Sequence, residues 1–186
     1  IEFLDGRRGE EAPFFLYMAL TSPHDPRMAP KPFSDMYRPA DMPIPPNFMG
    51  EHPFDNGDLV LRDELLTPLP QTHAAVQRHM ADYYAMISHD NYHLQRVFDA
   101  LEANGQLDNT IIVYTADHGL SVGQHGLLGK QNMYDHSTRI PLLMAGPGLP
   151  SGLQLTQLTY QIDIYPTLGE LAGVPIPDMV EGNSMK

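Results

Sequence analysis

Side chains that can do chemistry follow two apolar runs of the sequence. His24 comes shortly after the run 14–20, and the pair Asp117-His118 comes directly after the run 111–116. An Asp fixed at the tip of a buried strand is an oxygen ligand for a hard divalent cation. The adjacent His can add a ring nitrogen to the same ion or take part in proton transfer. The pattern predicts a metal site formed by Asp117 and His118.

A glycine-rich loop, 123–130, follows this pair and ends at Lys130. An ammonium and an imidazole can hold an anionic group and stabilise charge that develops on a departing oxygen. Lys130 and His24 are therefore candidates for substrate binding and catalysis. A non-functional role for both residues stays open, because lysines and histidines in loops are commonly solvated. An Asp-His-Gly triplet can also be a simple turn in which Asp117 bonds to nearby backbone.

A second pair of histidines, His89 and His93, lies four residues apart on one face of an expected helix. That spacing permits a zinc pair. Because no third ligand follows at helical spacing, the sequence favours a role in packing or at the surface.

The elements that must position these residues alternate between strand and helix. The runs 14–20, 111–116 and 140–145 are apolar without alternation, which is typical of strands buried on both faces of a sheet. A helical period extends over about 72–104, and a short helix is expected over 166–172. This order predicts an α/β fold with a mainly parallel sheet, in which ligands bind at the carboxyl ends of the strands.

Proline is concentrated in one segment. Of the 18 prolines, 11 fall within residues 23–70. Proline cannot donate a backbone hydrogen bond and fixes φ, so this segment cannot be a long helix or a central strand. We expect an ordered loop lying over the site, since loops of this length usually cover a site or are disordered.

The overall charge limits the function classes. Eleven Lys and Arg against 23 Asp and Glu give a net charge of -12. A nucleic-acid partner is improbable because it requires a basic face. An anionic substrate must therefore be met by a local cluster of donors. No apolar run reaches the roughly 18 residues of a membrane span.

Several motifs, spread in order over most of the chain, resemble the later part of a type I sulfatase, a family of the alkaline-phosphatase-like superfamily. They are Pro23-His24-Asp25-Pro26, the run from Ile111 to Gly119, Lys130, Arg139-Ile140-Pro141-Leu142 and Asp163-Ile164-Tyr165-Pro166-Thr167. The resemblance implies an α/β/α sandwich with a mainly parallel sheet, incomplete in this chain. It also implies hydrolysis of a sulfate monoester with a bound Ca²⁺ or Mg²⁺ ion.

The resemblance assigns roles to individual residues. Asp117 and His118 match two metal ligands of the family, and Lys130 matches the lysine that contacts the sulfate and the bridging oxygen. His24 matches the histidine that contacts the sulfate and assists the leaving group. His125, in a Gly-x-His-Gly stretch, is expected to be a residue of the substrate pocket.

One departure from the family is large. Family members use formylglycine, an oxidised Cys or Ser in a Cys/Ser-x-Pro-x-Arg motif, as the nucleophile, and this chain has no cysteine and no such motif. We expect residues 1–186 to be a partial catalytic domain, with the nucleophile-bearing part upstream and the C-terminal subdomain absent. The fragment alone is expected to be inactive.

Other functions stay open at this point. A phosphoester or phosphonate-ester hydrolase of the same superfamily would share the Asp-His-Gly sequence, and a non-catalytic sulfatase-like module would keep the fold. The family implies a small-molecule or glycan sulfate ester as substrate, with a preference for sulfated carbohydrates. It also implies a periplasmic or secreted location. The oligomeric state is not readable from the sequence.

Overall fold

A computed structural model describes all 186 residues, and their internal contacts form two compact units, Ile1–Pro147 and Gly148–Lys186. The larger unit contains every residue predicted to do chemistry. None of the helices combines the length and apolar character that crossing a membrane requires.

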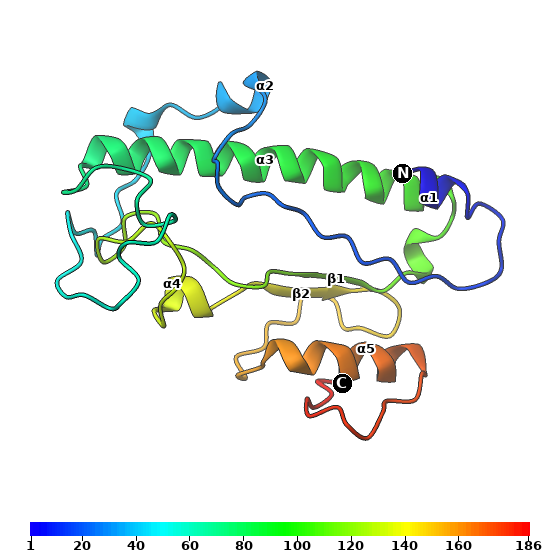
Figure 1. Ribbon diagram of the computed structural model, residues 1–186. Helices are drawn as coiled ribbons and strands as arrows, with labels where there is room; N and C mark the ends of the chain where they lie inside the picture. The colour runs from blue at the N-terminus through cyan, green and yellow to red at the C-terminus, as the bar shows by residue number, and fades with distance from the viewer. The chain divides into compact units, whose positions relative to one another are not determined.

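The largest element of the first unit is the helix α3 (His73–Ala103) (Figure 1). The Thr72 side chain caps it by accepting a hydrogen bond from the Ala75 N–H, and Asn104 ends it. The helix expected over 72–104 is therefore confirmed. On its predicted apolar face Val76, Met80 and Leu101 are buried, whereas the other four members are half-buried: Tyr83, Ile87, Leu94 and Phe98.

Two short strands form the sheet. β1 (Ile112–Thr115) pairs with β2 (Leu142–Ala145), so that Ile112 lies opposite Ala145 and Thr115 opposite Leu142. The strands expected over 111–116 and 140–145 are confirmed, together with the α/β class. The pair is antiparallel, although a mainly parallel sheet was expected. A parallel pair is usually joined by a crossover that contains a full helix. The connection here holds only the one-turn helix α4 (Asp135–Thr138).

The strand expected over residues 14–20 does not form. This segment belongs to no sheet, and Phe15 and Tyr17 are 76% and 81% exposed. A strand requires hydrogen-bonding partners on a neighbouring strand, and within this chain β1 and β2 pair only with each other. An apolar run alone therefore did not determine a strand.

The proline-rich segment 23–70 is a long loop, as expected, with two single-turn helices, α2 (Lys31–Ser34) and η1 (Pro39–Asp41). Both contact α3. The Tyr37 hydroxyl lies 2.6 Å from the Ser88 Oγ, and Gln77 donates to the Met42 carbonyl. These contacts hold part of the proline-rich segment against α3.

Two further short helices, α1 (Glu2–Asp5) and η2 (Leu107–Asn109), lie near the C-terminal end of α3. Asn104 donates to the Leu4 carbonyl over 2.7 Å. The buried apolar residues come from α1, α3 and the loop 119–131: Leu4, Val76, Met80, Ala81, Ala85, Met86, Leu101, Val122, Leu127 and Leu128. The core thus joins the helix to the loop that carries Lys130.

The second unit contains η3 (Gln161–Asp163) and α5 (Ile164–Ala172). The Asp163 carboxylate accepts hydrogen bonds from the Tyr160 and Asn183 N–H groups. These bonds lower the pKa of Asp163. The helix expected over 166–172 is confirmed and begins two residues earlier. It ends at Gly173, whose φ of +67° is a left-handed conformation that glycine adopts without strain.

Candidate active site

A cavity of about 460 Å³ in the first unit brings together four of the predicted site residues: His24, Asp117, His118 and Lys130. The loop after residues 14–20 supplies His24, and the loop after β1 supplies the other three. His24 and Lys130 are 106 positions apart in the chain. The cavity has two parts: the lysine side (His24, Asp63 and Lys130) and the aspartate side (Asp117 and His118).

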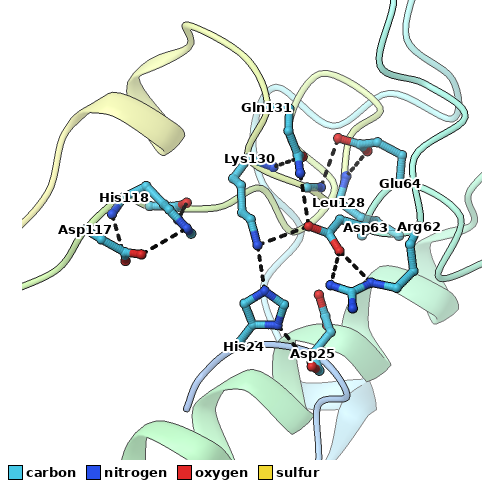
Figure 2. A network of polar contacts seen from close by, with 12 residues as sticks. His24, Asp25, Arg62, Asp63, Glu64, Asp117, His118, Leu128, Lys130 and Gln131 are labelled. Carbon is cyan, nitrogen blue, oxygen red and sulfur yellow. Dashed lines mark hydrogen bonds and ion pairs between the residues drawn. The ribbon is translucent and has the colours of Figure 1, made fainter. Parts of the chain in front are cut away.

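On the lysine side, the Lys130 Nζ lies 2.7 Å from the His24 Nε2 (Figure 2). The His24 Nδ1 lies 3.0 Å from the Asp25 carbonyl oxygen, which only accepts hydrogen bonds. The Nδ1–H therefore donates to that carbonyl, and the Nε2 lone pair faces the ammonium. The His24 ring is thus oriented to accept a hydrogen bond from the Lys130 ammonium at Nε2.

Asp63, which the sequence analysis missed, completes the lysine side. Its Oδ2 lies 3.0 Å from the Lys130 Nζ, and its side chain is only 7% exposed. Arg62 Nε donates to Oδ1 over 2.9 Å and Gln131 Nε2 donates to Oδ2 over 3.1 Å. Burial raises the pKa of Asp63, but hydrogen bonds from Arg62, Lys130 and Gln131 outweigh it and hold this pKa well below its ordinary value.

Glu64, the next residue, binds the backbone of the loop that carries Lys130. Its two carboxylate oxygens accept hydrogen bonds from the Leu128 N–H at 2.7 Å and the Gly129 N–H at 3.1 Å. Burial raises the pKa of Glu64. A signal for both acids was present in the sequence, since Arg62-Asp63-Glu64 is a charged triplet between apolar residues. It was not connected to Lys130, more than 60 positions away.

The same loop is also held by Arg27. This buried side chain donates to the Leu128 carbonyl over 3.1 Å and pairs with Asp25, with 2.9 Å between Nε and Oδ1. Burial lowers the pKa of Arg27, although Asp25 favours its charged form. The arginine thus connects the segment of His24 to the loop of Lys130.

On the aspartate side, the Asp117 Oδ2 lies 3.3 Å from the His118 Nε2, and the Asp117 side chain is 85% exposed. The Asp117 Oδ1 accepts a hydrogen bond from the His118 N–H, so the turn geometry that the sequence left open is present. The His118 Nδ1 lies 2.8 Å from the Gly119 carbonyl and donates to it. This contact fixes the orientation of the ring, with its Nε2 toward the Asp117 carboxylate.

A carboxylate oxygen and an imidazole nitrogen are both metal-ligand atoms, so Asp117 and His118 fit two positions of a ligand set. Calcium takes six to eight oxygen ligands. No group of three or more His, Cys, Asp or Glu side chains in the chain could hold an ion. The pair therefore fits as part of a larger ligand set and is not a metal site on its own.

Gly119 determines where this pair lies. Its N–H donates to the Ser137 carbonyl over 2.8 Å, and a Cβ on it would meet the His136 carbonyl oxygen at 2.0 Å. Only a glycine lets the chain pass so close to α4. The glycine after Asp117-His118 is thus a packing requirement.

His125 does not line the cavity. It stacks on Tyr134, with ring centroids 4.0 Å apart, and its Nε2 lies 3.0 Å from the Asn47 Nδ2. His136, which the sequence analysis did not select, does line the cavity, and burial lowers its pKa. The assignment of His125 to the substrate pocket stays a prediction.

His89 and His93 lie outside the cavity. Their Nε2 atoms are 3.0 Å apart, and Arg96 approaches the His93 Nδ1 at 3.0 Å. Because Arg96 only donates, His93 accepts at Nδ1 and donates from Nε2 to His89. The pair is thus a hydrogen-bonded chain in this conformation.

The chain is similar in sequence and in structure to known hydrolases. The choline-sulfatase of Rhizobium meliloti is 34% identical over 171 residues, covering 90% of this chain and 33% of that protein. The arylsulfatase of Clostridium perfringens is 35% identical over 192 residues, covering all of this chain and 39% of that protein. The phosphonate monoester hydrolase of Agrobacterium radiobacter superposes with a TM-score of 0.81 at 28% identity, covering 99% of this chain and 40% of that structure.

The chain thus spans between a third and two fifths of the length of these relatives. The solved structure shares the alkaline-phosphatase-like fold, of which this chain forms a part. The sequence model of the family described as Sulfatase matches residues 1–174. Because the match extends over nearly the whole chain, this chain belongs to the sulfatase family.

Proposed function

We propose that the whole protein is a sulfuric ester hydrolase that cleaves a sulfate monoester in this cavity. One observation carries the proposal: Lys130 contacts His24 at 2.7 Å across 106 residues of sequence, in the cavity that Asp117 and His118 also line. In a chain with a net charge of -12, a paired ammonium and imidazole form a local site for an anion.

The chemistry of this chain's residues is charge stabilisation and proton transfer at the leaving oxygen. When the bond between sulfur and the ester oxygen breaks, that oxygen becomes negative and takes up a proton. The Lys130 ammonium has three N–H donors, two of which face Asp63 and His24. The third can donate to the ester oxygen, and the contact with His24 keeps the ammonium directed.

The metal ion and the nucleophile belong to the proposal as well. Asp117 and His118 would be two ligands of a Ca²⁺ or Mg²⁺ ion, which would act as a Lewis acid toward the sulfate oxygens. The chain has no cysteine and no Cys/Ser-x-Pro-x-Arg motif, so the formylglycine would come from outside these 186 residues.

The test is hydrolysis of three esters of one phenol by the purified full-length protein: 4-nitrophenyl sulfate, the phosphonate monoester and the phosphate monoester. We expect the sulfate to have the highest kcat/KM. No turnover of any sulfate ester, including choline sulfate and sulfated sugars, would contradict the proposal. The 186-residue chain alone is expected to be inactive, and turnover by a preparation free of longer forms would contradict that.

A second candidate, phosphonate monoester hydrolysis, is favoured by the likeness to the Agrobacterium radiobacter enzyme, with its TM-score of 0.81. The same three substrates distinguish the two activities. A kcat/KM that is highest on the phosphonate monoester would select this candidate. The periplasmic or secreted location stays a prediction, which fractionation of the native host checks.

A further inference from the structure

Asp63 is an unexpected residue in a cavity proposed to bind an anion. Its side chain is 7% exposed and lines the cavity together with His24 and Lys130. A carboxylate there repels a sulfate group, so its presence requires a compensating role. The contacts of Asp63 indicate which role that is.

The Lys130 ammonium has two contacts, and Asp63 provides one of them. The Nζ lies 3.0 Å from the Asp63 Oδ2 and 2.7 Å from the His24 Nε2. A lysine ammonium is carried on a flexible four-carbon chain, so its position varies unless the ammonium is bound. With a carboxylate on one side and an imidazole on the other, the ammonium has a defined position (Figure 2).

The Asp63 carboxylate is paired with a second cation besides Lys130. Arg62 Nε donates to its Oδ1 over 2.9 Å, on the opposite oxygen from Lys130, and the Arg62 side chain is largely exposed. Arg62, Asp63 and Lys130 together carry a net charge of +1. Asp63 can therefore hold the ammonium without cancelling the positive charge of this three-residue group.

The fold of the loop does not depend on this contact alone. Glu64 accepts the backbone N–H groups of Leu128 and Gly129, and Arg27 donates to the Leu128 carbonyl. These bonds hold the backbone that leads to Lys130. Asp63 binds the end of the side chain, which is a separate function.

We propose that Asp63 is a positioning residue that holds the Lys130 ammonium against His24, at the place where the leaving oxygen of the substrate departs. The proposal rests on the proposed hydrolase function. It adds a residue that acts through Lys130.

The activity test compares Asp63→Asn, Lys130→Ala and the double variant in the full-length protein. If Lys130 stabilises the leaving oxygen, its displacement matters most for poor leaving groups. We expect Asp63→Asn to lower kcat by about tenfold on 4-nitrophenyl sulfate and about a hundredfold on phenyl sulfate, with little change in KM. In the Lys130→Ala background, Asp63→Asn should cause less than about a twofold further loss.

Two variants serve as controls. Asp63→Glu keeps the charge and should restore most of the kcat lost in Asp63→Asn. Asp35→Asn breaks an exposed Lys31–Asp35 ion pair in the same loop and should leave both substrates unaffected. Equal losses on both sulfates, or additive losses in the double variant, would show a general structural role and overturn the proposal.

A crystal structure of the full-length Asp63→Asn protein tests the positioning without any activity. We expect the Lys130 Nζ to leave hydrogen-bond distance of the His24 Nε2. An unmoved Lys130 would overturn the inference even in an active enzyme. An inactive wild-type protein with a displaced Lys130 in the variant would instead contradict the proposed function alone.

Discussion

Lys130 and Asp117 line the same cavity, but this chain holds them in different ways. Lys130 is bound by Asp63 and His24, and its side chain is 18% exposed. The Asp117 side chain is 85% exposed and is turned toward His118 of its own loop. The lysine side is built from contacts between distant segments, whereas the aspartate side is built from neighbours in sequence.

This difference follows from what each side requires. An ammonium is fixed by one carboxylate and one ring nitrogen, and both are present in the chain. A hard cation requires several more oxygen ligands than Asp117 and His118 supply. The contacts of the lysine side are therefore complete within this chain, whereas Asp117 and His118 alone do not form a cation site.

The largest effect is expected from removing the metal of the full-length protein. Dialysis against a chelator should lower kcat/KM by about a thousandfold or more, because the proposed ion supplies several kcal/mol of charge stabilisation. Addition of Ca²⁺ or Mg²⁺ should restore activity and show which ion serves. Full activity in metal-free protein would mean that the aspartate side does not hold a catalytic ion.

Substitution on the lysine side should have the next largest effect. We expect Lys130→Ala to lower kcat on an aryl sulfate by about ten- to a thousandfold, as for the loss of one transition-state donor. Steady-state kinetics of the full-length protein measure it. Lys31→Ala, at an exposed lysine, is the control. Unchanged turnover in Lys130→Ala would remove Lys130 from the mechanism.

Glu64→Gln should act on stability. The amide has only one acceptor oxygen, so one of the buried N–H groups of Leu128 and Gly129 loses its partner. We expect a loss of about 1–3 kcal/mol in the free energy of unfolding. Denaturant unfolding of the full-length protein measures this, with the exposed Glu51→Gln as the control. A loss no larger than that of the control would show that the loop is held mainly by Arg27.

The smallest effect is the pH dependence of Asp63. Its pKa is depressed in the folded protein, so its ionised form contributes stability at neutral pH. That contribution is complete above the unfolded value of about 3.9 and declines as the pH falls below it. The melting temperature of wild type should exceed that of Asp63→Asn at pH 7, and the two should converge below about pH 4. A difference that stays constant with pH would contradict the ionic role.

Several elements could be predicted because their signals are local. The apolar period and the Thr72 cap lie within α3 itself, and Gly173 ends α5 through its own backbone conformation. Residues 14–20 carried an equally clear apolar signal and were predicted wrongly. A strand depends on a partner elsewhere, and no other strand in this chain pairs with that segment.

The candidate site was also predictable only in part. His24 and Asp117 follow apolar runs and Lys130 ends the glycine-rich loop, and all three line one cavity. Asp63 could not be selected, because it lies in a proline-rich loop without periodicity and meets Lys130 only across 67 positions of sequence. His125 has a distinctive sequence context and its ring stacks on Tyr134, and its role in the substrate pocket stays a prediction.

The sequence by itself determined the kinds of group available: an acidic chain with few cations, an Asp-His pair at a strand end, and motifs in the order of the sulfatase family. These features depend on residue types and short spacings, because local sterics and hydrogen bonding act between residues that are close in sequence. Only the tertiary structure decided that Lys130 lies between Asp63 and His24, since these groups come from three separate segments. Distances between such segments depend on packing of the whole unit, which no local pattern encodes.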